Sequence, residues 1–156
     1  MSVAITGPLY FEDLPIGYES IVGSYELRAE EIIELASRWD PQPFHIDEEA
    51  AKNSVFGGLV ASSLHLFAIC TRLFFDHADE IQTVAMLGKD KIRLPNPARA
   101  GSTLTYFTRC IDRRESKGRP DVGIVTFEDE LKDENGKTVL TQEVTLMVAR
   151  KPQASV

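Results

Sequence analysis

The sequence predicts an α+β fold in which an antiparallel sheet packs against a long helix. Residues 28–39 and 55–75 have the amphipathic or apolar character of helices, whereas four segments after residue 82 alternate apolar and polar residues as strands do. Short turns join these four segments, so successive strands should pair antiparallel. The resulting order is a strand, a helix, a loop, a long helix and a four-strand meander, which is typical of α+β proteins.

Length and composition predict one globular domain spanning residues 1–156. The chain is 43% hydrophobic and 26% charged, and its formal net charge is −7. This charge argues against general binding to nucleic acids or to anionic membranes. The two cysteines, Cys70 and Cys110, lie in apolar surroundings without metal-ligand or disulfide spacing. We therefore expect buried thiols, no metal, and a cytoplasmic protein, with no signal peptide at the N-terminus.

The first third of the chain leads into a short amphipathic helix. Residues 10–17 form an irregular segment or short strand, and residues 18–27 have the aromatic and β-branched content of a strand. Residues 28–39 place Ile32, Leu35, Ala36 and Trp39 at helical spacing. We expect Trp39 to pack in the core.

An aspartate and a histidine follow this helix at a short spacing. Pro41 and Pro43 lie between Asp40 and His45. Because proline disfavours helical backbone in the preceding residue, the helix should end near Trp39 and the next residues should form a stiff loop. Such a loop can turn both side chains into one space, where they could act as an acid/base pair. The alternative is that Asp40 caps local backbone and His45 is an ordinary loop histidine.

The central part of the chain predicts a short helical turn and then the long helix. Residues 47–53 contain good helix formers, and Asp47 could cap them. Residues 55–75 read as a long helix with Gly57 and Gly58 in its first turn, and their N–H groups could stabilise an oxyanion there. Polar residues within this segment and the acidic run after it argue against a membrane span.

The last half of the chain predicts strands separated by turns. His77 should lie at the end of the long helix, and Asn135-Gly136 should form a hairpin turn. The predicted strands are residues 83–94, 103–111, 122–131 and 138–149.

Two sequence patterns resemble one enzyme family. DPQPFHID at residues 40–47, followed by FGGLVASSLH at 56–65, resembles the MaoC-like dehydratases, also called (R)-specific enoyl-CoA hydratases. The resemblance extends to YFEDLPIG at 10–17, and to KDKIR at 89–93 with PARAGSTL at 97–104. It implies the hot dog fold, in which an antiparallel sheet wraps around a long central helix.

The resemblance implies the reversible addition of water across the α,β double bond of an enoyl thioester. Asp40 and His45 would then handle the water and the proton transfers, and the sequence leaves open which of them is the base. The N–H of Gly57 is the first candidate for binding the thioester oxygen, and that of Gly58 is the second.

Three further residues are candidates for the substrate site. Ser62 lies where the family places polar supporting residues, but its hydroxyl could equally bond to its own helix. His65 is a possible substrate-side contact, although a helix histidine in an apolar stretch is more often a core residue. Phe56 could line an apolar acyl tunnel or pack in the core.

The thioester carrier, coenzyme A or an acyl-carrier group, would need cations for its phosphate groups. The candidates are Lys89, Lys91, Arg93 and Arg99, and alternation places the first three on one face of a predicted strand. The alternative is that they form a solvated surface row. No dinucleotide fingerprint is visible, so we expect no cofactor other than the coenzyme A of the substrate.

The open edge of an antiparallel sheet needs covering, so we expect a homodimer or a higher homo-oligomer. Two other functions stay open. A hot dog thioesterase would use a carboxylate and water to attack the thioester carbon. A non-catalytic subunit would bind an acyl thioester without turnover.

Overall fold

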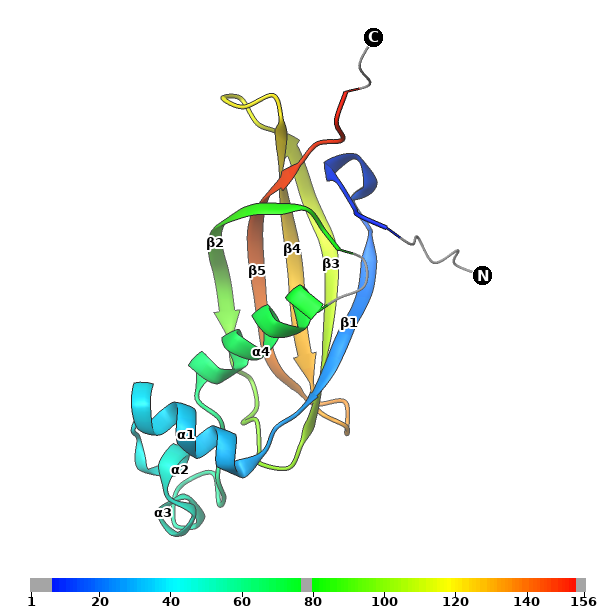
Figure 1. Cartoon of the computed structure of the whole chain (residues 1–156). Coiled ribbons are helices and arrows are strands. Elements are labelled where there is room, and N and C mark those ends of the chain that lie inside the picture. The colour runs from blue at the N-terminus through cyan, green and yellow to red at the C-terminus, as the bar shows by residue number, and fades with distance from the viewer. Residues whose placement is uncertain (1–6, 77–79, 154–156) are drawn as a thin grey trace.

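The computed structural model describes residues 7–76 and 80–153 and shows one five-stranded antiparallel sheet with a long helix across one face (Figure 1). The strand order is β1-β3-β4-β5-β2, and every neighbouring pair is antiparallel. The predicted α+β class and the sheet wrapped around a central helix are therefore confirmed.

The strands lie close to their predicted ranges. They are β1 (Glu19–Glu26), β2 (Thr83–Arg93), β3 (Thr103–Glu115), β4 (Val122–Lys132) and β5 (Thr138–Ala149). β3 is longer than predicted because its polar end still pairs with β4, with Glu115 opposite Gly123. The predicted hairpin turn is present, and Gly136 adopts the left-handed φ of +79° that such a turn requires.

Four helices and one 3₁₀ turn complete the described chain. They are η1 (Phe11–Asp13), α1 (Ala29–Trp39), α2 (Pro43–Ile46), α3 (Glu48–Lys52) and α4 (Ser63–Asp76). The predicted cap of α3 is confirmed, because Oδ1 of Asp47 accepts hydrogen bonds from the N–H groups of Glu49 and Ala50 at 2.9 and 3.0 Å. In Figure 1, α1, α2 and α3 gather at one end of α4.

The predicted start of the long helix is wrong. α4 begins at Ser63 and not near Phe56. The N–H groups of Val60 and Ala61 bond to the carbonyls of Phe44 and Ala98 at 3.2 and 2.9 Å, so this stretch is held between two loops. The glycines therefore lie in a turn before the helix.

The prediction that Trp39 packs in the core is also wrong. Trp39 is the last residue of α1 and is 66% exposed, with the guanidinium of Arg38 5.3 Å from its ring centroid. The helix buries Ile32 and Ala36 instead. His77 lies outside the described residues.

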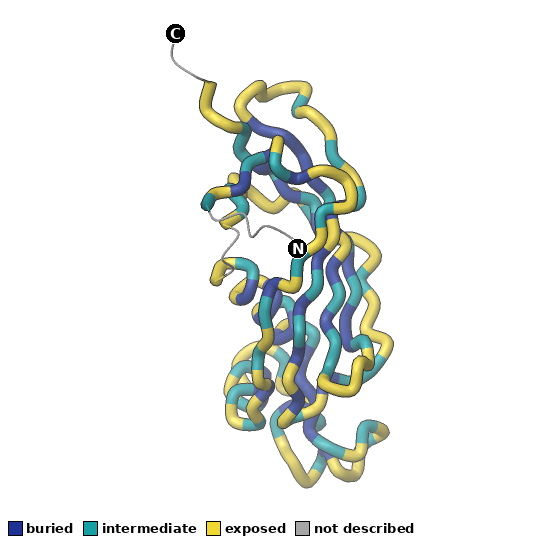
Figure 2. Tube along the Cα trace, turned by 90° about the vertical axis from the view of Figure 1, so that its right-hand side faces the viewer, coloured by how far each residue is buried: buried dark blue, intermediate teal, exposed yellow. Residues whose placement is uncertain are grey.

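The core lies between α4 and the inner face of the sheet. Figure 2 shows buried segments running along the strands and exposed segments at the loops. Cys70 and Cys110 are buried free thiols, as predicted. None of the helices in the described part of the chain is long and apolar enough to cross a membrane.

Candidate active site

A cleft of about 390 Å³ lies where α2, the start of α4 and the loop after β2 meet. Its walls are mostly apolar, and Asp40 and His45 are the titratable side chains among its lining residues. Within the described ranges, no three His, Cys, Asp or Glu side chains gather as metal ligands would. The lining residues are Asp40, Gln42, Phe44, His45, Phe56, Val60, Ala61, Ser63, Leu66, Leu94, Pro95, Asn96, Pro97, Ala98 and Val139.

The structure brings Asp40 and His45 together. Asp40 ends α1 with a non-helical backbone, and Pro43 opens α2, which carries His45 on its first turn. This change of direction places Nε2 of His45 3.4 Å from Oδ2 of Asp40. His45 is 6% exposed, so the pair is sheltered from bulk water on the histidine side.

The hydrogen bond of the other ring nitrogen fixes the protonation pattern of His45. Nδ1 lies 2.6 Å from the carbonyl oxygen of Val60. A carbonyl can only accept, so Nδ1 must carry a proton and donate. Nε2 then holds a lone pair in neutral His45 and an N–H in charged His45, and in both states it faces Asp40.

Two side chains donate hydrogen bonds to the Asp40 carboxylate. The Ser62 hydroxyl donates to Oδ2 at 2.7 Å, and Nε2 of Gln42 donates to Oδ1 at 2.9 Å. The bond from Ser62, then that from Gln42 and the charge of His45, lower the pKa of Asp40 below its ordinary value, against the opposing effect of burial. Asp40 is therefore ionised at neutral pH.

Ser62 also caps α4. Its hydroxyl accepts the N–H of Leu64 at 3.2 Å, and its carbonyl accepts the N–H groups of His65 and Leu66 at 3.0 and 3.3 Å. Ser63 is consequently the first helical residue, and it lines the cleft. The N–H groups of a first turn have no partner within their helix, and the N-terminal end carries a partial positive charge.

A sequence profile of the family described as "MaoC like domain" matches residues 22–132. The chain belongs to this family. A MaoC-like dehydratase from Rhodospirillum rubrum is 36% identical, with a TM-score of 0.87 over 93% of this chain and 99% of that one. An R-hydratase from Pseudomonas aeruginosa shares the fold, with a TM-score of 0.76 at 16% identity over 94% and 96% of the two chains. These neighbours confirm the hot dog fold.

A mesaconyl-CoA hydratase from Haloarcula hispanica is 39% identical over 70 residues. The match covers 44% of this MaoC-like chain and 20% of the relative. The part of this chain that matches therefore spans about a fifth of the length of that curated relative.

The position of the two glycines in this MaoC-like domain does not suit the predicted oxyanion role. The N–H of Gly57 already donates to the carbonyl of Ser54 at 3.1 Å, and the φ of Gly57 is +67°, as the turn requires. Neither Gly57 nor Gly58 lines the cleft. The N–H of Ser63 replaces them as the candidate oxyanion donor. Ser63 was not identified from the sequence because the predicted start of the long helix lies several residues too early.

Phe56 lies on the wall of the cleft, which is one of the two positions that the sequence left open for it. Its ring packs edge-on against Phe44, with centroids 5.0 Å apart, and Phe44 packs against His45 at 4.6 Å. Arg99 holds this loop in place, because its Nη1 donates to the Phe56 carbonyl at 2.6 Å. Phe56 therefore links the loop before α4 to the Asp40–His45 pair.

His65 is placed away from the cleft. It is 1% exposed, and its Nε2 lies 3.3 Å from Oε1 of Glu31 on α1. The hydroxyl of Tyr25 donates to the same carboxylate at 2.7 Å. Because His65 is not a lining residue of the cleft, we interpret it as a core residue that ties α4 to α1.

The predicted row of three cations on one strand face is wrong. Nζ of Lys89 donates to Gln142 on the inner face of β5 at 3.1 Å, whereas Nζ of Lys91 pairs with Glu143 on the outer face at 3.0 Å. The alternation fails because the register of β2 shifts between Asp90 and Arg93, and Lys91 has a φ of +50°. The Arg93 guanidinium is exposed and donates to the neighbouring backbone.

Lys91 belongs instead to a groove of about 780 Å³ on the outer face of the sheet. Three ion pairs join charged side chains that line this groove, namely Lys91–Glu143 at 3.0 Å, Arg109–Glu128 at 2.9 Å and Lys132–Glu130 at 3.0 Å. We therefore assign the chemistry to the cleft and not to this larger groove.

Proposed function

We propose that this protein catalyses the reversible hydration of an enoyl thioester to a 3-hydroxyacyl thioester. The contact between Nε2 of His45 and the ionised carboxylate of Asp40 in an apolar cleft carries this proposal. Membership of the MaoC-like family, whose solved relatives include a dehydratase, supports it.

In the proposed mechanism the water molecule attacks the β-carbon of the double bond. Asp40 takes one proton from this water, since Ser62 and Gln42 keep its carboxylate ionised. The protonated Nε2 of His45 gives its proton to the α-carbon. The proton on Asp40 then passes to Nε2 across the 3.4 Å contact, and the pair returns to its starting state with one water added to the substrate.

Negative charge gathers on the thioester oxygen while the α-carbon is being protonated. We assign its stabilisation to the N–H of Ser63 and to the positive end of α4. The first turn of α4 lies at the cleft because the Ser62 hydroxyl fixes it to Asp40. The acid/base pair and the oxyanion donor are thus tied together by one side chain.

The substrate is proposed to arrive as a coenzyme A or acyl-carrier thioester, with no other cofactor. Phe44, Phe56 and Leu94 give the cleft apolar walls that suit an acyl group. Because a relative that matches part of the chain is a mesaconyl-CoA hydratase, mesaconyl-CoA should be tested beside the simpler crotonyl-CoA.

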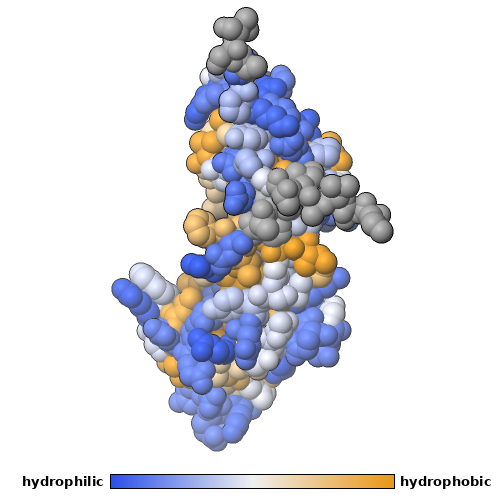
Figure 3. All heavy atoms as spheres, turned by 45° about the vertical axis from the view of Figure 1, so that its right-hand side comes forward, coloured by the Kyte–Doolittle hydropathy of each residue, from blue (hydrophilic) through white to orange (hydrophobic). Residues whose placement is uncertain are grey.

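We also propose a homodimer formed through β2. This strand is an edge of the sheet, and Val84, Met86 and Leu87 on it are about half exposed. Figure 3 shows apolar side chains reaching the surface around the middle of the molecule, between more polar ends. Light scattering should give the mass of two chains for the wild type and a lower mass for Leu87→Lys, whereas a wild-type mass of one chain would contradict the dimer.

The hydration proposal is tested by following loss of enoyl-thioester absorbance beside release of free thiol, with crotonyl-CoA and mesaconyl-CoA. The wild type should consume the double bond without releasing thiol, and Asp40→Asn should abolish this. Asp47→Asn is the matched control, since Asp47 lies in the same segment but caps α3. Thiol release by the wild type would instead indicate a thioesterase, and full activity of Asp40→Asn would place the chemistry elsewhere.

A further inference from the structure

A second polar contact joins α1 to α4, apart from the bond between Asp40 and Ser62. Nε2 of His65 lies 3.3 Å from Oε1 of Glu31. Glu31 belongs to the first turn of α1 and Asp40 follows the last one, so the two contacts are about 14 Å apart along that helix. On α4 they are one turn apart, because Ser62 precedes the helix and His65 lies in its first turn. The two contacts therefore fix the crossing of the helices at two points.

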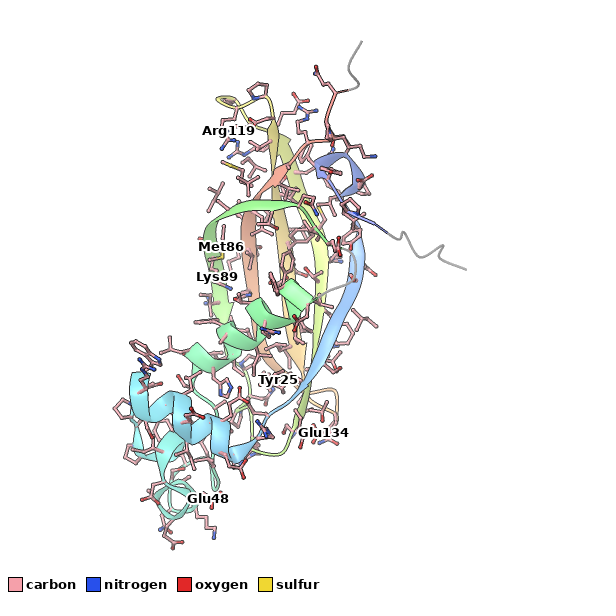
Figure 4. The ribbon with its side chains drawn as sticks, viewed as in Figure 1. Tyr25, Glu48, Met86, Lys89, Arg119 and Glu134 are labelled. Carbon is pink, nitrogen blue, oxygen red and sulfur yellow. The ribbon has the colours of Figure 1, made fainter. Side chains whose placement is uncertain are left out.

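The carboxylate of Glu31 is itself held by its neighbours. The hydroxyl of Tyr25 lies 2.7 and 2.8 Å from its two oxygens, and Figure 4 shows Tyr25 where β1 leads into α1. The bond from Tyr25 is the largest cause that lowers the pKa of Glu31, so the carboxylate is ionised at neutral pH. Nη2 of Arg28 lies 3.7 Å from it on the exposed side. A carboxylate only accepts, so Nε2 of His65 carries a proton and donates.

His65 is costly as a core residue. It is 1% exposed, and its Nδ1 is buried without a hydrogen-bond partner in the part of the chain that the structure describes. Burial lowers the pKa of His65, so at neutral pH Nδ1 holds a lone pair that is withdrawn from water. An apolar side chain of similar size would pack there without this cost. Packing alone does not account for the histidine, whereas the directional bond from Nε2 does.

The backbone of α4 carries this bond to the Asp40–His45 pair. The N–H of His65 donates to the carbonyl of Ser62 at 3.0 Å, so the anchored imidazole and the Ser62 hydroxyl belong to one turn. That hydroxyl donates to Oδ2 of Asp40, the oxygen that faces Nε2 of His45. A helix held by this one bond could pivot about it, since apolar contacts are not directional. The bond at Glu31, at the far end of α1, removes this freedom.

We propose that His65 and Glu31 are positioning residues for the reaction. Their hydrogen bond sets the angle between α1 and α4 and so holds the Ser62 hydroxyl against the carboxylate of Asp40. Neither residue lines the cleft, so both act through Asp40 and not on the substrate itself. The inference rests on the proposed hydratase function and deepens it.

The variant that tests this is His65→Leu, which removes the bond and keeps an apolar side chain of similar size in the core. It should be at least as stable as the wild type at neutral pH, because the buried lone pair is gone. Its kcat/KM for crotonyl-CoA should fall by about threefold to tenfold. The acid limb of the kcat/KM profile should move to higher pH, because a looser bond from Ser62 raises the pKa of Asp40. His65→Gln keeps a donor to Glu31 and should restore most of both.

Two further variants separate positioning from a general structural role. Arg28→Gln removes an exposed ion pair to the same carboxylate without touching α4, and it should leave kcat/KM unchanged. The double variant Ser62→Ala/His65→Leu should lose no more than Ser62→Ala alone, because both changes act on one hydrogen bond. Additive losses in this cycle, or an equal loss in Arg28→Gln, would overturn the inference.

The pKa of Asp40, followed by NMR of its carboxyl carbon, is a readout that needs no turnover. A higher pKa in His65→Leu, without hydration of any enoyl-CoA by the wild type, would support the positioning and overturn the reaction. Hydration of crotonyl-CoA, with the Asp40 pKa and kcat/KM unchanged in His65→Leu, would do the reverse. If the activity of His65→Leu falls only as its folded fraction falls, the role of His65 is structural and the inference is overturned.

Discussion

The hydroxyl of Ser62 donates a 2.7 Å hydrogen bond to Oδ2 of Asp40, joining the N-terminal cap of α4 to the end of α1. Ser62 is 1% exposed and also accepts the N–H of Leu64, so its hydroxyl hydrogen is directed at the carboxylate. This bond orients Asp40 towards His45 and keeps Asp40 ionised. It is also the contact that places the first turn of α4 beside Asp40 and His45.

Ser62→Ala should therefore change both the titration and the orientation of Asp40. Without the hydroxyl donor the pKa of Asp40 rises, because the hydrogen bond from Ser62 is the largest cause of its lowering. The acid limb of the kcat/KM profile should move to higher pH. At neutral pH kcat/KM should fall by about tenfold, because the carboxylate is no longer held by the Ser62 hydroxyl in the position that faces His45. Ser62→Thr keeps a hydroxyl and should keep the acid limb near its wild-type position. An unchanged profile in Ser62→Ala would show that Asp40 is not the group that titrates in the reaction.

Ser63→Pro should remove the proposed oxyanion donor and leave the helix intact. Proline is favoured at the first position of a helix, where its missing N–H costs no intrahelical hydrogen bond. We expect kcat to fall on the order of a hundredfold to a thousandfold, as for the loss of one oxyanion-hole donor. Ser63→Ala retains the N–H and should lose far less.

Thermal unfolding should show that the Ser63→Pro variant has folded. If this variant is as stable and as active as Ser63→Ala, the thioester oxygen is bound by another group. If Ser63→Pro is both less stable and less active, its kcat is compared with that of Ser63→Ala at a lower temperature, where both variants are folded.

Local pattern was enough to predict most of the sheet. The two-residue alternation of β4 places Val125, Phe127 and Leu131 on the buried face, and the Asn135-Gly136 turn fixes its register with β5. These features depend on neighbouring residues, which is why they can be read along the chain.

The features that were predicted wrongly depend on contacts between residues that are distant in the chain. A short apolar run such as residues 59–61 suits a helix or an extended segment equally well, and hydrogen bonds to Phe44 and Ala98 decide between them. The bulge at Lys91 breaks the alternation of β2 in the same way. In the site, the two prolines predicted that Asp40 and His45 would meet. Ser62 was a candidate through the family resemblance alone, and its bond to Asp40, which lies 22 residues away in the chain, could not be predicted from local pattern.

Gly123 on β4 leaves room for the ring of Phe11. A Cβ at this position would overlap the ring, and the guanidinium groups of Arg113 and Arg150 also lie near this ring, at 4.1 and 5.5 Å from its centroid. Gly123→Ala should lower the free energy of unfolding by about 1–3 kcal/mol. Gly118→Ala, where a Cβ meets no atom within 4 Å, should change it little. Denaturant unfolding of both variants checks this, and equal stabilities would show that η1 contributes little to the fold.

The pair of His65 and Glu31 should make stability depend on pH. Burial lowers the pKa of His65 more than Glu31 raises it, so the folded chain favours the neutral imidazole. The unfolded chain takes up a proton near the ordinary histidine pKa of 6.5, and stability is lost as the pH falls below that value. The hydrogen bond from Tyr25 lowers the pKa of Glu31, so its contribution is lost only at lower pH, below its ordinary value of 4.5.

His65→Gln tests this assignment, because an amide can still donate to Glu31 but does not titrate. The midpoint of thermal unfolding of the wild type should fall between about pH 7 and about pH 5. The variant should lose most of that fall, even if its stability at neutral pH is lower. If the unfolding midpoints of the two proteins fall in parallel with pH, a group other than His65 takes up the proton on unfolding. His65 would then already be protonated in the folded chain despite its burial.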